Sequence, residues 1–286
     1  MSAQVMMEAQ PAAARGGPRQ FDVVGILALS GVGLFVLLAI AGPWLTPHDP
    51  GAGSLIDANL GSDSGHLLGY DSLGRDIFSR LLAGARTSFL GPLVVATVVT
   101  LLGTFLAFLA AWFRTLGLVL SGITSVMFAF PGLLIAALAA SVFSPGLIAA
   151  VIALSVAYTP HMIRLVRSVA EEQIAKDYVL ALRIQGISVS RITLHHVLPN
   201  LRTFVLGQAS VTLAWSTVDM AALSFLGLGV QQPAVDWGVM VAEGKTGVLQ
   251  GYPTASIAAG LCLVVAVVSF IVVGQRLTRR AEQVAR

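Results

Sequence analysis

Long apolar runs alternate with short polar segments along most of the chain. A helix needs about 20 apolar residues to cross roughly 30 Å of hydrocarbon, and six runs approach or exceed that length. These runs are Val23–Trp44, Phe89–Phe113, Leu116–Phe143, Leu147–Val166, Phe204–Leu228 and Ile257–Val273. Because lipid offers no hydrogen bonds to the backbone, each run is predicted to form a helix, which satisfies its own amides and carbonyls. The pattern therefore predicts an all-α integral membrane protein with six transmembrane helices.

The polar segments between these runs define the predicted organisation. The chain is predicted to begin with a disordered cytoplasmic tail over 1–22 and a first transmembrane helix over 23–44, followed by an extracytoplasmic loop over 45–86. A core transmembrane domain is predicted over 87–275, and it includes a polar loop over 168–203. A cytoplasmic tail is predicted over 276–286. Within the extracytoplasmic loop, the pattern from Arg75 to Arg86 is helical and amphipathic. We expect that stretch to lie along the membrane surface before the second span.

The first apolar run follows Arg15 and Arg19, so a cleaved secretory signal is an alternative interpretation. The apolar region of such a signal is about 7–15 residues long, whereas this run is close to 20. Its length therefore favours an uncleaved first transmembrane helix.

Composition and charge support a membrane protein and add an orientation. The chain is 56% hydrophobic and 11% charged, against about 25% charged residues in soluble domains. If both termini are cytoplasmic, 13 of the 17 Lys and Arg residues fall on the cytoplasmic side, as the positive-inside rule requires. The same basic residues are spread over separate loops, which is not typical of nucleic-acid binding.

Two features within the predicted helices point to an aqueous path through the bundle. Pro131 and Gly132 would kink the third helix, which is either functional or an ordinary bend. Asp219 is an acid well inside the fifth helix, and its burial in lipid costs about 2.5–3.5 kcal/mol unless it faces protein or water. Ser216 fits a water-lined face of the same helix, although helix packing explains it equally well. Pro131, Ser216 and Asp219 are therefore the candidate residues of a translocation path.

The polar loop contains a compact module over Asp177–Asn200, DYVLALRIQGISVSRITLHHVLPN. The pattern predicts an amphipathic helix over Asp177–Gln185, ended by Gly186, and a second short helix closed by Pro199. Two short helices of this kind can fill a groove on another protein. We therefore interpret the module as a docking site for a soluble cytoplasmic partner.

The same residues resemble the EAA loop of binding-protein-dependent ABC importer permeases. Gly186, Leu198 and Pro199 match the pattern of that loop, whereas His196 replaces an isoleucine and Leu180 replaces the usual glutamate. Four further segments resemble the dipeptide, oligopeptide and nickel branch of these permeases: LGYDSLGRDIFSRLLAGARTSFL at Leu68–Leu90, FAFPGLL at Phe128–Leu134, LSFLGLGVQQP at Leu223–Pro233 and WGVMVAEGK at Trp237–Lys245.

The resemblance implies a type I ABC importer permease whose module over Asp177–Asn200 couples it to an ATPase. The implied coupling residues are Asp177, Tyr178, Ala181, Leu182, Gly186, Leu198 and Pro199. In place of the missing glutamate, either Asp177 supplies a charge or Tyr178, Val179 and Leu182 insert into the groove of the partner.

The resemblance also implies partners and a location. It implies a second homologous permease subunit, one or two cytoplasmic ATP-binding subunits that carry ATP and Mg, and an extracytoplasmic binding protein. Leu68–Arg86 and Val230–Thr246 are the expected dock for that binding protein. This chain would bind no cofactor itself and would be a multi-pass protein of the inner membrane of a prokaryote. Its cargo would be di- or oligopeptides, with nickel or another small solute as the alternative.

Other functional classes fit the residues less well. Gly244, Lys245 and Thr246 end like a phosphate-binding loop, but Val239 stands where that motif needs glycine, so no ATPase is predicted in this chain. The five histidines include no pair at i, i+4, the usual helical metal spacing, and no metal site is predicted. A proton-coupled transporter with Asp219 as carrier remains an alternative, although it leaves the docking module unexplained.

Overall fold

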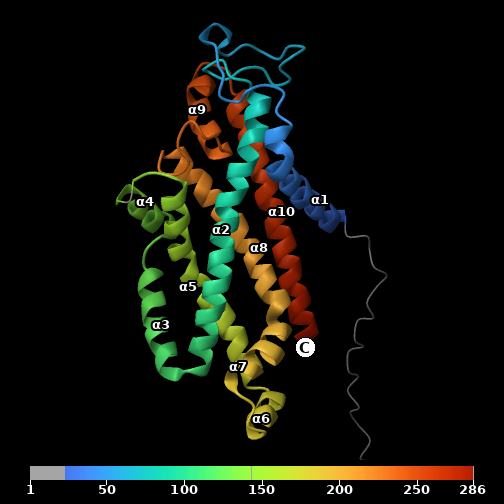
Figure 1. Ribbon diagram of the computed structural model, residues 1–286, viewed down its shortest axis with the longest axis vertical. Helices are drawn as coiled ribbons and strands as arrows, with labels where there is room; N and C mark the ends of the chain where they lie inside the picture. Colours follow the sequence, from blue (N-terminus) through green and yellow to red (C-terminus); the bar gives the residue numbers. More distant parts are fainter. Residues whose placement is uncertain (1–22, 143, 286) are drawn as a thin grey trace, which may run out of the picture.

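A computed structural model describes residues 23–142 and 144–285, and the described part is all-helical (Figure 1). The predicted tail over 1–22 and the last residue of the third run, Phe143, lie outside the described residues. The α-helices are α1 (Val23–Ala41), α2 (Ile77–Trp112), α3 (Arg114–Met127), α4 (Gly132–Val142), α5 (Leu147–Ile174), α6 (Asp177–Ile184), α7 (Val189–Ile192), α8 (Leu198–Phe225), α9 (Trp237–Leu249) and α10 (Thr254–Ala285). Short 3-10 turns cover Gly42–Trp44 and Leu55–Asp57, and a π-helical turn covers Thr193–Val197.

The long helices α2, α5, α8 and α10 run side by side and bury two hydrophobic clusters (Figure 1). One cluster lies between α2, α5 and α8, where Val99, Met162 and Leu223 are almost fully buried. The other joins α1 and α10 to α2 and α9. At its centre, the ring of Phe35 lies 4.9 Å from that of Trp237 and 5.8 Å from that of Phe270. The first predicted span is thus packed into the fold through Phe35.

Each predicted span lies mostly in helix, but six spans are not confirmed. Four described helices, α1, α2, α5 and α10, are long and apolar enough to cross a membrane, and the bent pair α3 and α4 makes a fifth if it counts as one span. The helix over the predicted fifth span, α8, is more polar. Its polar residues are tolerated because α8 packs against α2, α5, α9 and α10 within the bundle.

The third predicted span is broken into two helices rather than kinked. The axes of α3 and α4 differ by 84° across a break of four residues. Pro131 has no amide to donate, and it disfavours the helical conformation of the residue before it, Phe130. The chain therefore ends α3 in tight turns, and a new helix begins where Leu134 donates to the carbonyl of Pro131 at 3.0 Å.

The predicted surface helix over Arg75–Arg86 is not a separate element. Residues from Ile77 onward are the first turns of α2, and the Asp76 carboxylate caps that helix by accepting from the amide of Ser79 at 2.7 Å. Most of the polar side of this stretch faces the protein, since Asp76 and Arg80 are each only 3% exposed, whereas Arg86 at its end is exposed. Ion pairs with other segments bury this part of the polar face.

Helix α9 was not predicted, and it is fixed onto α2 and α8. The Asp236 carboxylate caps α9 by accepting from the amide of Val239 at 2.6 Å and also accepts from the Ser224 hydroxyl of α8 at 2.7 Å. The indole of Trp237 donates to the carbonyl of Leu81 in α2 at 3.0 Å. These bonds bring the segment after α8 back against the start of α2.

We expect Gly238→Ala to lower the free energy of unfolding by about 1–3 kcal/mol. A Cβ at Gly238 would lie 2.7 Å from the Cα of Ala221, so α9 would have to move away from α8. Gly260→Ala on α10 is the matched control, because a Cβ there meets nothing within 4 Å. Thermal unfolding of both variants in one detergent tests this, and equal midpoints would contradict the close packing of α9 on α8.

Candidate functional site

The predicted docking module begins with a helix and a glycine turn. Helix α6 covers Asp177–Ile184, and Gly186 follows it with φ +77°. The amide of Gly186 donates to the carbonyl of Arg183 at 3.0 Å, and the amide of Ile187 donates to that of Leu182 at 3.2 Å. A left-handed glycine with such bonds is a common helix end. The helix ends at Ile184, one residue before the predicted Gln185, and Gly186 ends it as predicted.

The second helix of the module differs from the prediction. Helix α7 (Val189–Ile192) continues through a π-helical turn into α8, so no helix is closed by Pro199. Pro199 lies in the first turn of α8 instead. In the first turn of a helix the missing amide of proline costs no hydrogen bond. Leu198 and Pro199 therefore connect the module rigidly to the long helix α8.

Burial identifies which apolar side chains of the module are available to a partner. Val179 is fully buried, and Tyr178 and Leu182 pack against the cluster between α2, α5 and α8. A buried Val179 cannot insert into a partner, so that part of the prediction is wrong. On α6 the exposed large apolar side chains are Leu180 and Ile184, which are 56% and 79% exposed and lie one turn apart. Val189 and Leu194 are exposed in the second half of the module. Asp177 and Ala181 are also exposed, as a docking surface needs.

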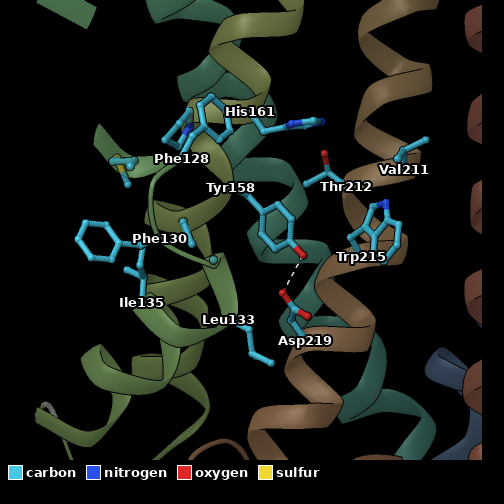
Figure 2. A pocket seen from close by; sticks show the side chains of 14 residues that line it. Phe128, Phe130, Leu133, Ile135, Tyr158, His161, Val211, Thr212, Trp215 and Asp219 are labelled. Carbon is cyan, nitrogen blue, oxygen red and sulfur yellow. Dashed lines mark hydrogen bonds between the residues drawn. The ribbon is translucent and has the colours of Figure 1, made fainter. Parts of the chain in front are cut away.

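A cavity of about 420 Å³ lies between the α3–α4 break, α5 and α8 (Figure 2). Its lining residues are Met127, Phe128, Phe130, Gly132, Leu133, Ile135, Ala157, Tyr158, Pro160, His161, Val211, Thr212, Trp215 and Asp219. In Figure 2 the Tyr158 hydroxyl points at the Asp219 carboxylate and donates to Oδ2 at 2.8 Å. Asp219 therefore faces a cavity, as its cost in lipid predicted. Tyr158 was not predicted, because one tyrosine in an apolar run has no distinguishing pattern.

The other two candidate path residues lie differently. Pro131 forms the break between α3 and α4, and its neighbours Phe130 and Gly132 line the cavity. Ser216 is fully buried, and its hydroxyl donates to the carbonyl of Leu213 at 3.1 Å and lies 3.4 Å from that of Pro92. Ser216 is not among the residues that line this cavity, and it packs α8 against α2.

A largely buried ion cluster joins the two segments predicted to receive the binding protein. Arg80 donates to Asp71 Oδ2 at 2.5 Å and to Glu243 Oε2 at 2.6 Å, and Arg75 donates to the same two oxygens at 2.8 and 2.6 Å. Gln232 donates to the other oxygen of Glu243 at 2.5 Å. Sequence reasoning missed this cluster, because Arg75 and Glu243, for example, are 168 positions apart in the chain.

A second polar cluster fixes the segment 45–76 onto the start of α2. The rings of His48 and His66 stack at 4.1 Å, and His66 Nδ1 lies 3.0 Å from the Asp76 carboxylate. Burial raises the pKa of Asp76, but its hydrogen bonds with Ser79 and His66 outweigh burial and hold that pKa below its usual value. The carboxylate that caps α2 is therefore ionised at neutral pH.

Comparisons with known proteins agree with this architecture. This chain superposes on a solved structure of the methionine ABC transporter MetNI in an inward-facing conformation with a TM-score of 0.56 and 20% sequence identity. The match covers 69% of this chain and 94% of the MetNI chain. That likeness shows the fold, a type I ABC permease.

Sequence relatives share more of their residues with this chain. The dipeptide transport system permease of Alkalihalophilus pseudofirmus is 31% identical, covering 89% of this chain and 83% of its own. The di/tripeptide permease of Pseudomonas aeruginosa is 34% identical over 85% and 82%. The dipeptide permease of Escherichia coli is 33% identical over 76% and 75%. The family model described as binding-protein-dependent transport system inner membrane component matches residues 100–283, and the chain therefore belongs to that family of membrane permeases.

Proposed function

We propose that this chain is the permease subunit of an ATP-driven importer that translocates di- or oligopeptides. The observation that supports a peptide cargo is that relatives are named dipeptide or di/tripeptide permeases. These relatives are 31–34% identical to this chain over three quarters or more of its length. Family membership supports the ATP-driven mechanism, because permeases of this family work with separate ATP-hydrolysing subunits. Nickel or another small solute is the alternative cargo.

The coupling element of the proposed importer is the module over Asp177–Asn200. Figure 1 shows α6 and α7 at one end of the bundle and α9 with residues 45–76 at the other. Exposed Leu180 and Ile184 give the module an apolar face for an ATP-binding subunit. In this arrangement ATP and Mg belong to the partner subunits, six spans place both termini in the cytoplasm, and a second permease subunit completes the path.

The opposite end is the proposed dock for the extracytoplasmic binding protein. The ion pairs of Arg75 and Arg80 with Glu243 join Leu68–Arg86 to Val230–Thr246. The two sequence segments that were expected to receive the binding protein thus form one surface. A surface held by these charges can transmit a docking event to α2, which carries Arg80, and to α9, which carries Glu243.

Uptake assays test the proposed function directly. Cells with and without this chain are given labelled dipeptide, labelled tetrapeptide or labelled nickel, each with and without ATP depletion. We expect loss of the chain to abolish ATP-dependent peptide uptake. Loss of nickel uptake alone would replace the cargo with nickel, and peptide uptake that survives ATP depletion would contradict the ATP-driven mechanism.

Asp219→Asn separates the importer from a proton-coupled transporter. Asparagine cannot carry a proton, so in a proton-coupled transporter the variant would lose the pH dependence of uptake. We expect the peptide uptake that remains in Asp219→Asn to require ATP and to follow external pH as the wild type does. Uptake measured between pH 5.5 and 8 with and without an uncoupler checks this, and a pH profile that flattens in the variant would favour proton coupling.

A further inference from the structure

The carboxylate of Asp219 lacks a cationic partner in the cavity between α3, α4, α5 and α8. Among the residues that the structure describes, its hydrogen-bond partner is the neutral hydroxyl of Tyr158 at 2.8 Å, and it forms no ion pair. No Lys or Arg is among the described lining residues, and His161 is the one lining side chain that can become a cation. A carboxylate in such surroundings is stabilised by a cation that enters the cavity.

The side chains around Asp219 favour an organic cation. Helix α8 places Thr212, Trp215 and Asp219 on one face, at spacings of three and four residues (Figure 2). Trp215 is 51% exposed, so its indole is available to a ligand in the cavity. The indole is the best side chain for attracting a cation through its ring face, and a carboxylate beside an aromatic ring is a recurrent way to bind ammonium groups. The Tyr158 hydroxyl fixes the carboxylate from the α5 side.

We propose that Asp219 and Trp215, with Tyr158 as a positioning residue, form a subsite for a primary ammonium group of the cargo. This inference rests on the proposed peptide cargo, because every peptide with a free N-terminus carries such a group. A lysine side chain offers the same chemistry. An ammonium group loses hydrating water when it enters the bundle, and binding to this subsite replaces the lost interactions. The subsite thereby lowers the free-energy barrier for a charged peptide that passes through a largely apolar cavity.

A cysteine reporter in the cavity tests the subsite without relying on uptake. The full chain carries Cys262→Ala, which removes the native thiol, and Ala157→Cys, a small change at a lining position. Membranes are treated with aminoethyl methanethiosulfonate, which bears an ammonium group, or with neutral methyl methanethiosulfonate. The measured quantity is the ratio of the two modification rates.

We expect Asp219→Asn to lower that ratio about tenfold, equivalent to about 1.4 kcal/mol of attraction for the ammonium. Asp219→Glu should keep a high ratio. Asp49→Asn removes one negative charge from an exposed position on the extracytoplasmic segment and is the matched control, with an unchanged ratio. A reporter at Val211→Cys repeats the measurement from α8 if the first position reacts too slowly. An equal ratio in wild type and Asp219→Asn would overturn the subsite.

Protection of the same cysteine identifies the source of the ammonium. Ala-Ala carries only the α-ammonium, N-acetyl-Ala-Lys carries only the side-chain ammonium, and N-acetyl-Ala-Ala carries neither. We expect one or both ammonium-bearing peptides to slow modification by the neutral reagent, and this protection to disappear in Asp219→Asn. Equal protection by N-acetyl-Ala-Ala, or protection by Ni²⁺ alone, would overturn the ammonium assignment. Absence of peptide uptake by wild-type cells would refute the proposed cargo instead, and the rate ratio would still report on Asp219.

Discussion

Gly186→Val is expected to abolish uptake while leaving the amount of chain in the membrane unchanged. Gly186 ends α6 with φ +77°, a conformation that β-branched residues avoid at a cost of about 1–3 kcal/mol. A Cβ at this position meets nothing within 4 Å, so the effect acts on the backbone turn rather than through a clash. The turn sets the angle between α6 and α7, and therefore the geometry offered to an ATP-binding subunit. Uptake per membrane-inserted chain is the measurement.

Two controls separate the turn from general strain. Gly186→Asn should keep most of the uptake, because asparagine tolerates the left-handed region. Gly251→Val introduces the same kind of strain at φ +89°, also without neighbours within 4 Å, at the end of α9. We expect it to keep most of the uptake, since Gly251 lies far from the module and outside Leu68–Arg86 and Val230–Thr246, the segments of the proposed dock. Normal uptake by Gly186→Val would refute a coupling role for this turn.

Most of the long helices could be predicted from the sequence because each has its own cause in the local pattern, whereas α9 was missed. Apolar runs of membrane length marked α1 closely and located α5 and α10, but both of these helices extend beyond the apolar runs, and α10 continues through most of the predicted tail over 276–286. The glycine at the end of α6 was predicted at Gly186. The break at Pro131 was recognised as an interruption but not as a bend of 84°. A proline removes a hydrogen bond wherever it stands, whereas the angle that follows depends on how α4 packs against α5.

The errors share one physical origin, which is that a pattern shows two faces of a helix but not what each face contacts. Arg80 was assigned to a polar surface, and the structure buries it against Asp71 and Glu243. Val179 was assigned to a docking face, while its neighbour Leu180 is the exposed side chain. Asp219 was placed correctly because a carboxylate in a span has few tolerable environments.

Glu243→Gln is expected to lower the free energy of unfolding by about 2–3 kcal/mol, which is below the full cost of removing one partner from a buried ion pair because the Glu243 side chain is 21% exposed. Glu243 accepts from Arg75 and Arg80 at 2.6 Å each, and the side chain of Arg80 is only 3% exposed. The variant leaves Asp71 alone to balance two guanidinium groups. One of these, Arg80, already has a buried Nε without a hydrogen-bond partner.

Glu171→Gln provides the same chemical change at an accessible ion pair. Glu171 accepts from Arg167 at 2.6 Å, but its side chain is 48% exposed, so water replaces the lost charge and the cost is at most about 1 kcal/mol. Unfolding of both variants in one detergent therefore isolates the contribution of burial. Equal losses would show that the charges between α2 and α9 are hydrated. A loss confined to Glu243→Gln, together with weaker uptake at low concentrations of the binding protein, would show that these buried charges hold the proposed docking surface together.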